Sequence, residues 1–183
     1  MYFPSQKPLS FARQALALIV FVALSRVIPH PPNFTPLFSV TIFSAYFAPS
    51  FWWAIAIPQG ALLLSNIFIG FSSSAMITAI FCVGMAVFAK SAKCVTNSQS
   101  IFWLASSIVV PALFFVVSNF FVWLDSSFYS QDLAGLVLCY TSAVPFALSS
   151  FTSTLAYSFL FFEVPRMLSI LYNGVIGHEM EQN

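Results

Sequence analysis

Long apolar runs, separated by short polar or proline-rich connectors, make up most of this sequence. The runs cover residues 11–28, 37–48, 51–71, 75–89, 101–124 and 133–162. A helix of about 20 apolar residues is long enough to cross the hydrocarbon core of a bilayer. The pattern therefore predicts an all-α integral membrane protein: a six-helix transmembrane bundle forming a single domain over residues 1–183.

The segment 37–48 decides the number of spans, because it is short and bounded by Pro36 and Pro49. It could be a re-entrant segment or a short, tilted helix. Cytoplasmic ends of membrane helices are enriched in Lys and Arg. If the segment spans, only Arg26 lies outside, and the other basic residues share the side of both termini: Lys7, Arg13, Lys90, Lys93 and Arg166. We therefore predict six spans with cytoplasmic N- and C-termini.

The first run also follows basic residues, as the apolar core of a signal peptide does. No small-x-small cleavage site follows it, and it leads directly into Arg26 and a group of prolines. We expect residues 11–28 to remain as the first helix of the mature protein.

Composition supports the membrane class and excludes others. Hydrophobic residues make up 60% of the chain, charged residues only 6%, and the net charge is +1. About a quarter of the residues of a soluble domain are charged. A net charge of +1 gives no electrostatic basis for binding nucleic acid. The cysteines match neither a disulfide framework nor a zinc site, and we expect buried free thiols at Cys82, Cys94 and Cys139.

The connector 26–36 is the most unusual stretch of the chain. It contains four prolines together with Arg26, His30 and Asn33. Proline lacks an N–H and clashes with helical neighbours, so this segment is expected to be a rigid loop. In a chain with so few polar residues, a cation, an imidazole and an amide in one rigid loop indicate a binding site.

A few polar side chains fall within the apolar runs. Gln59 and Asn66 share one helix face, and Asn119 and Trp123 share another. Such groups either form hydrogen bonds between helices or line a pocket open to the outside. Both interpretations stay open for Gln59, Asn66 and Asn119.

Arg26 has three alternative roles. It could extend to the membrane interface, pair with Asp125 or Asp132, or bind an anionic group of a ligand through its planar guanidinium. His30 has no neighbouring His or Cys in the sequence, so no metal site is predicted there.

Catalytic motifs are missing from the sequence. We find no glycine-rich phosphate loop, no H-E-x-x-H and no nucleophile elbow. We predict neither an enzyme nor a cofactor.

Four stretches resemble a family of uncharacterised bacterial membrane proteins whose proposed role is transport. They are Ser25–Pro36, Leu64–Gly70, Ser118–Trp123 and Gly135–Tyr140 with Pro145-Phe146. That family in turn is similar to the substrate-binding S components of energy-coupling factor (ECF) vitamin transporters. This resemblance implies a six-helix bundle in which the loop between helices one and two covers a ligand pocket at the outer face. The residues it would place in or around the pocket are Arg26, His30, Asn33, Asn66, Asn119 and Trp123.

The chain also departs from that pattern. Asn66 stands where the resemblance implies an Asp, and Ser72 and Ser73 stand near the place of an expected His. The first run has no pair of alanines four residues apart, of the kind with which S components often dock their transmembrane partner.

The leading hypothesis is a substrate-capture subunit of a vitamin or micronutrient importer, which binds a small polar ligand at the outer face. Its partners would be the lipid bilayer, the ligand and an energising transmembrane or ATPase module. The alternative is a structural or accessory subunit of a larger membrane complex, with the pocket region filled by side chains. The expected location is a bacterial cytoplasmic membrane or an organelle membrane of bacterial descent.

Overall fold

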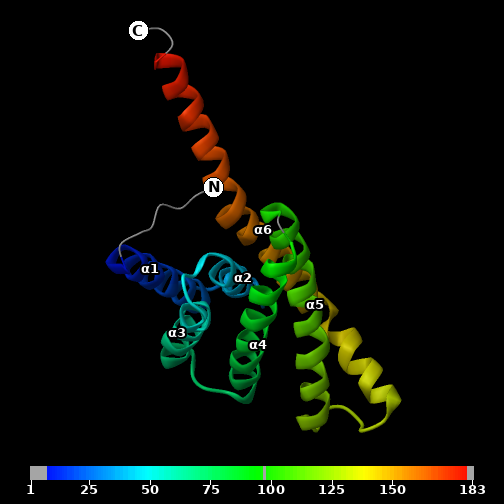
Figure 1. Ribbon diagram of the computed structural model, residues 1–183. Helices are drawn as coiled ribbons and strands as arrows, with labels where there is room; N and C mark the ends of the chain where they lie inside the picture. Colours follow the sequence, from blue (N-terminus) through cyan, green and yellow to red (C-terminus); the bar gives the residue numbers. More distant parts are fainter. Residues whose placement is uncertain (1–7, 97, 181–183) are drawn as a thin grey trace.

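The computed structural model describes residues 8–96 and 98–180, and this part of the chain forms six α-helices and no strand (Figure 1). Their bounds are α1 Pro8–Val27, α2 Leu37–Phe47, α3 Phe51–Ile69, α4 Ser73–Val95, α5 Gln99–Asp125 and α6 Leu133–Met180. Each helix corresponds to one apolar run of the sequence. The predicted all-α class is therefore confirmed. Lys7 lies outside the described residues.

Side-chain caps start several helices at the polar connectors. The hydroxyls of Ser50, Ser72 and Ser98 accept hydrogen bonds from the backbone N–H groups three residues later, at 3.2–3.4 Å. Such caps satisfy N–H groups that have no partner within the helix. At the end of α3, Gly70 has φ +99°, a conformation that favours glycine.

The short helix α2 lies at the centre of the molecule. It packs against each of the five other helices of the described chain, and most of its residues are buried. Its fully buried side chains include Val40, Thr41 and Ile42. A helix that is apolar on all sides belongs inside a protein, so α2 is the core element of the bundle.

The other five helices surround α2 in the order α1, α3, α4, α5, α6, with each neighbouring pair in contact. Gly60 on α3 allows a close approach to α1, since a Cβ there would lie 3.1 Å from the Ile19 side chain. The seam between α6 and α1 differs, because their Cα atoms do not come within 8 Å of each other. Aromatic rings bridge it: Phe21 contacts Tyr157 and Phe161.

Four helices of the described chain are long and apolar enough to cross a membrane: α3, α4, α5 and residues Leu133–Ile170 of α6. Many large apolar side chains on these helices are exposed, among them Phe68, Met76 and Ile80, each about 70% accessible. Lipid is the solvent that such a surface requires. The molecule is thus a helical membrane protein. The crossing of α1 and α2 stays a prediction.

The end of the bundle away from the 28–36 loop contains a polar network that joins α5 to α6. The buried Glu163 carboxylate accepts hydrogen bonds from Trp103 Nε1 at 2.8 Å and Ser100 Oγ at 3.0 Å. Arg166 forms an ion pair with the same carboxylate at 3.3 Å. Beyond this network α6 continues as a single helix past the other helices (Figure 1).

The cysteines follow the prediction only in part. All three are free, and Cys82 and Cys139 are buried as expected. Cys94 is exposed, because it lies in the last turn of α4 where the helix leaves the packed core.

Candidate functional site

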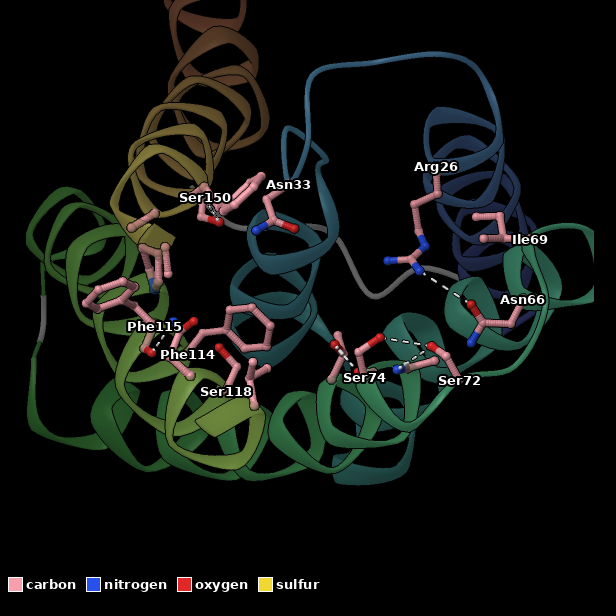
Figure 2. Close-up of a pocket in the computed structure, with 18 of the residues that line it drawn as sticks. Arg26, Asn33, Asn66, Ile69, Ser72, Ser74, Phe114, Phe115, Ser118 and Ser150 are labelled. Atoms are coloured by element: carbon pink, nitrogen blue, oxygen red, sulfur yellow. Dashed lines mark hydrogen bonds between the residues drawn. The ribbon is translucent and has the colours of Figure 1, made fainter. Parts of the chain in front are cut away.

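A polar pocket opens at the end of the bundle where α1 and α3 end and α4 begins (Figure 2). Its volume is about 350 Å³, at the small end of the range for ligand pockets. We call it the Arg26 pocket. Its polar lining comes from five helices and the 28–36 loop: Arg26, Asn33, Asn66, Ser72, Ser74, Thr78, Ser118, Asn119 and Ser150.

Arg26, in the last turn of α1, reaches across to α3. Its Nε donates to Ser65 Oγ at 2.9 Å, and its Nη2 donates to Asn66 Oδ1 at 3.4 Å. Arg26 does not pair with Asp125 or Asp132, which was one of its three predicted roles. The ion pair found in the described chain joins Arg166 to Glu163. Among the described residues, the groups that bond to the guanidinium are neutral.

Asn66 is the most deeply buried of the predicted site residues, with 5% of its surface accessible. Its Oδ1 accepts the hydrogen bond from Arg26, and its Nδ2 has no hydrogen-bond partner among the described residues. Because Asn66 lines the pocket, this amide offers a donor to whatever enters.

Asn119 lines the opposite wall of the Arg26 pocket, on α5. Its Nδ2 donates to the Phe115 carbonyl of its own helix at 2.7 Å. The amide is therefore fixed by its own helix and makes no described side-chain bond to another helix. Gln59, in contrast, donates to the Ala79 carbonyl on α4 at 2.8 Å and lies outside the pocket lining. For Gln59 the helix-to-helix interpretation is correct.

The proline-rich loop brings Asn33 to the pocket and fixes it there. Asn33 has φ +61°, in the left-handed region that Asn tolerates better than most residues. Its carbonyl accepts a 3.4 Å hydrogen bond from Ser153 on α6. Close by, Ser39 at the start of α2 donates to the Thr154 carbonyl at 2.9 Å. The loop is thus attached to α6 at the α1–α6 seam.

Two predicted site residues lie outside the pocket lining. His30 Nδ1 lies 2.8 Å from the Pro31 carbonyl within the loop itself. Trp123 Nε1 donates to the Ser130 carbonyl at 2.9 Å and so braces the connector between α5 and α6. In this structure both side chains stabilise loops.

The connector after Trp123 is closely packed against the start of α6. Asp132 Oδ1 accepts a hydrogen bond from the Gly135 N–H at 2.8 Å and from Ser130 Oγ at 2.7 Å. These two donors, the Gly135 N–H first, hold the pKa of the Asp132 carboxyl below its usual range. The aspartate therefore caps α6 in its ionised form.

The sequence did not point to the serines or to the phenylalanines of the pocket wall. Ser72, Ser74, Ser118 and Ser150 line the pocket, as do Phe114, Phe115 and Phe146. For Ser72 a signal existed, because a serine immediately before an apolar run is a common helix cap. The others carry no distinctive pattern in so apolar a sequence.

The electrostatics of the Arg26 pocket are simple. Arg26 is the charged member of the described lining, and no Asp or Glu belongs to it. The first turn of α4 also faces the pocket, and a helix N-terminus carries a partial positive charge. Within the described ranges, no group of three His, Cys, Asp or Glu side chains could hold a metal ion. The arrangement can bind and orient a polar molecule.

Comparison with known proteins gives a family. A model described as "Family of unknown function (DUF6580)" matches residues 8–174. The chain belongs to this family. The DUF6580 match covers all six helices except the last residues of α6, so the pocket lies entirely within the family's common region. No curated protein and no solved structure matches the chain.

Proposed function

We propose that this DUF6580 protein is a substrate-capture membrane subunit that binds a small polar solute in the Arg26 pocket. One observation carries the proposal: the pocket is open, and it lies between the proline-rich loop and one end of the helical bundle. Four residues singled out from the sequence line it, namely Arg26, Asn33, Asn66 and Asn119. The lining combines these polar groups with phenylalanine and alanine side chains, and small-molecule sites likewise combine apolar walls with convergent polar groups.

The proposal includes a topology of six spans with both termini in the cytoplasm. Lys90, Lys93 and Arg166 lie toward the end of the bundle opposite the pocket, which the positive-inside rule assigns to the cytoplasm. The pocket then faces outward. With 11 residues, α2 is roughly 17 Å long and shorter than the hydrocarbon core, but it packs against the five other helices of the described chain and most of its residues are buried.

The proposed role is that of an ECF S-component-like subunit of a vitamin or micronutrient importer. The loop between the first two helices contributes Asn33 to the pocket lining, which agrees with the lid expected from that resemblance. Because the sequence has no phosphate-binding loop, transport would require an energising partner. The membrane would be a bacterial cytoplasmic membrane or an organelle membrane of bacterial descent.

The alternative of a structural or accessory subunit predicts that side chains fill the region below the loop. A cavity of about 350 Å³ with an unpaired amide N–H in its wall favours solute capture instead. We therefore retain capture as the conclusion.

The test is mass spectrometry of small molecules released from the full chain after gentle purification in detergent. Ala147 lines the pocket, whereas the next residue, Leu148, is 61% exposed on the outside of α6. We expect a stoichiometric compound in the wild type and in Leu148→Phe. We expect its loss in Ala147→Phe, because the added ring would occupy the cavity. Absence of any compound from the wild type, with membrane proteins copurifying instead, would favour the accessory-subunit alternative.

A further inference from the structure

We propose that the ligand of the Arg26 pocket carries an anionic oxygen group, a carboxylate or a phosphate, which binds between Arg26, Asn66 and the first turn of α4. The proposal rests on the solute-capture function and specifies the chemistry of its ligand. Three independent features of the pocket lead to it.

The first feature is an uncompensated charge. The Arg26 side chain is half-buried, and no carboxylate of the described chain pairs with it. A cation removed from water and left without an anion is unfavourable, so such groups are usually paired. In this pocket the neutral oxygens of Ser65 and Asn66 fix the guanidinium without neutralising it.

The second feature is the direction of the remaining donors. A guanidinium has five N–H groups, and the described bonds of Arg26 use its Nε and Nη2 atoms. Nη1 has no described partner. Figure 2 shows the guanidinium pointing from α1 into the space enclosed by the lining side chains. Its free edge is thus presented to the cavity, in the planar geometry that suits a carboxylate or phosphate.

The third feature is the pair of groups beside Arg26. Asn66 is a buried residue with 5% of its surface accessible, and its Nδ2 donor has no described hydrogen-bond partner. The first turn of α4 contributes Ser74 and Ala75 to the lining, after the Ser72 cap. A helix N-terminus favours an anion. An amide donor, a helix N-terminus and a guanidinium therefore converge on one end of the cavity.

The opposite wall determines the rest of the ligand. Phe114, Phe115 and Phe146 line it, and Ser118, Asn119 and Ser150 add polar groups. A compact molecule with an anionic head and an apolar or aromatic body matches this division.

The experiment compares ring compounds of nearly equal size and different charge. The full chain in detergent is heated at pH 7 and constant ionic strength with benzoate, phenyl phosphate, benzamide or benzamidinium. We expect benzoate or phenyl phosphate to raise the melting temperature more than the neutral and cationic compounds do. The anion that gives the larger rise identifies the preferred head group. Equal rises for all four compounds, or no rise with either anion, would overturn the proposal.

The matched variants are Arg26→Gln and Arg13→Gln, since Arg13 is exposed at the other end of α1. Losing charge-assisted hydrogen bonds should weaken binding of the effective anion roughly 10- to 100-fold in Arg26→Gln. Arg13→Gln should bind as the wild type does. An Arg26→Gln protein that keeps wild-type affinity would contradict the inference. If Arg26→Gln does not fold, the comparison of the four ring compounds on the wild-type protein still tests the inference.

The compounds released from the purified wild-type protein and identified by mass spectrometry test this inference and the proposed function separately. An uncharged or cationic compound in the aqueous extract would overturn the anion site and leave solute capture standing. An anionic lipid in the organic extract would support the anion site and overturn solute capture. An aqueous anion supports both.

Discussion

The indole Nε1 of Trp103 donates a hydrogen bond to Oε1 of Glu163, 60 residues along the chain, at 2.8 Å. Ser100 and Arg166 donate to the same carboxylate, so one buried acid joins α5 to α6. This contact lies at the end of the bundle away from the Arg26 pocket. It shows how the chain retains a carboxylate at low cost: each oxygen has a partner.

Replacing Glu163 by Ala should destabilise the protein by roughly 1–3 kcal/mol, because Trp103 loses its acceptor in a buried position. Glu163→Gln keeps an acceptor oxygen and should cost less. Thermal melting in detergent measures both. The control is Arg166→Ala, whose half-exposed side chain contributes at most about 1 kcal/mol. Equal losses in all three variants would show that the buried hydrogen bond is not the source.

Gly135→Ala should be strongly destabilising, by about 1–3 kcal/mol or more. A Cβ at this buried position would collide with the backbone carbonyl and hydroxyl of Ser130, which cannot move without disturbing the cap of α6. Gly84 is a matched control, since a Cβ there would meet nothing within 4 Å. In Gly84→Ala, within α4, stability should be unchanged or slightly higher. A loss of stability well below about 1 kcal/mol in Gly135→Ala would contradict this prediction, because it would mean that Ser130 can shift to make room for the added Cβ.

Asp132 should make stability depend on pH in the acid range. Its pKa is lower in the folded protein than in the unfolded chain, because the Gly135 N–H and the Ser130 hydroxyl bind the ionised form. Its contribution is therefore complete above the unfolded pKa and is lost as the pH falls through the lower folded pKa. We expect the melting temperature of Asp132→Asn to lie below the wild-type value at pH 7. The two should converge below the folded pKa. A difference that is constant with pH would contradict this assignment.

Thiol labelling tests the proposed topology. Cys94 is exposed near the basic end of α4, whereas Cys82 and Cys139 are buried. A membrane-impermeant maleimide should modify the chain at Cys94 in inverted vesicles and leave it unmodified in right-side-out vesicles. Cys94→Ser should abolish the labelling. Reaction from the outside would reverse the orientation and move the Arg26 pocket to the cytoplasmic face.

The apolar runs located all six helices of the described chain, because most runs end at prolines, serines or charged residues where the helix also ends. The end of α6 was missed: the run stops at Phe162, but the helix continues through Glu163 and Pro165 to Met180. The sequence did not reveal the central place of α2. Residues 37–48 are too short and too uniformly apolar to present one face, so the pattern could not distinguish a re-entrant segment from a core helix. The three hydroxyl residues Ser39, Thr41 and Ser44 would suggest a polar side, yet all three bond to backbone carbonyls inside the bundle.

The site was only partly accessible to the same reasoning. Arg26, Asn33, Asn66 and Asn119 line one pocket, and their part in ligand binding stays a prediction. His30 and Trp123 bond to nearby loop carbonyls, a local choice that spacing along a helix cannot reveal. The role of Ser65 was equally hidden, since only the packing of α1 on α3 brings it to Arg26.

The central position of α2 limits how this family can change in length. One residue inserted into a helix turns everything after it by about 100° and advances it by about 1.5 Å. Within α2 that shift would move side chains away from five neighbours at once. In the part of α6 beyond Arg166, outside the packed bundle, the same insertion would disturb little. Insertions and deletions should therefore be tolerated at the far end of α6 and eliminated by selection between Leu37 and Phe47.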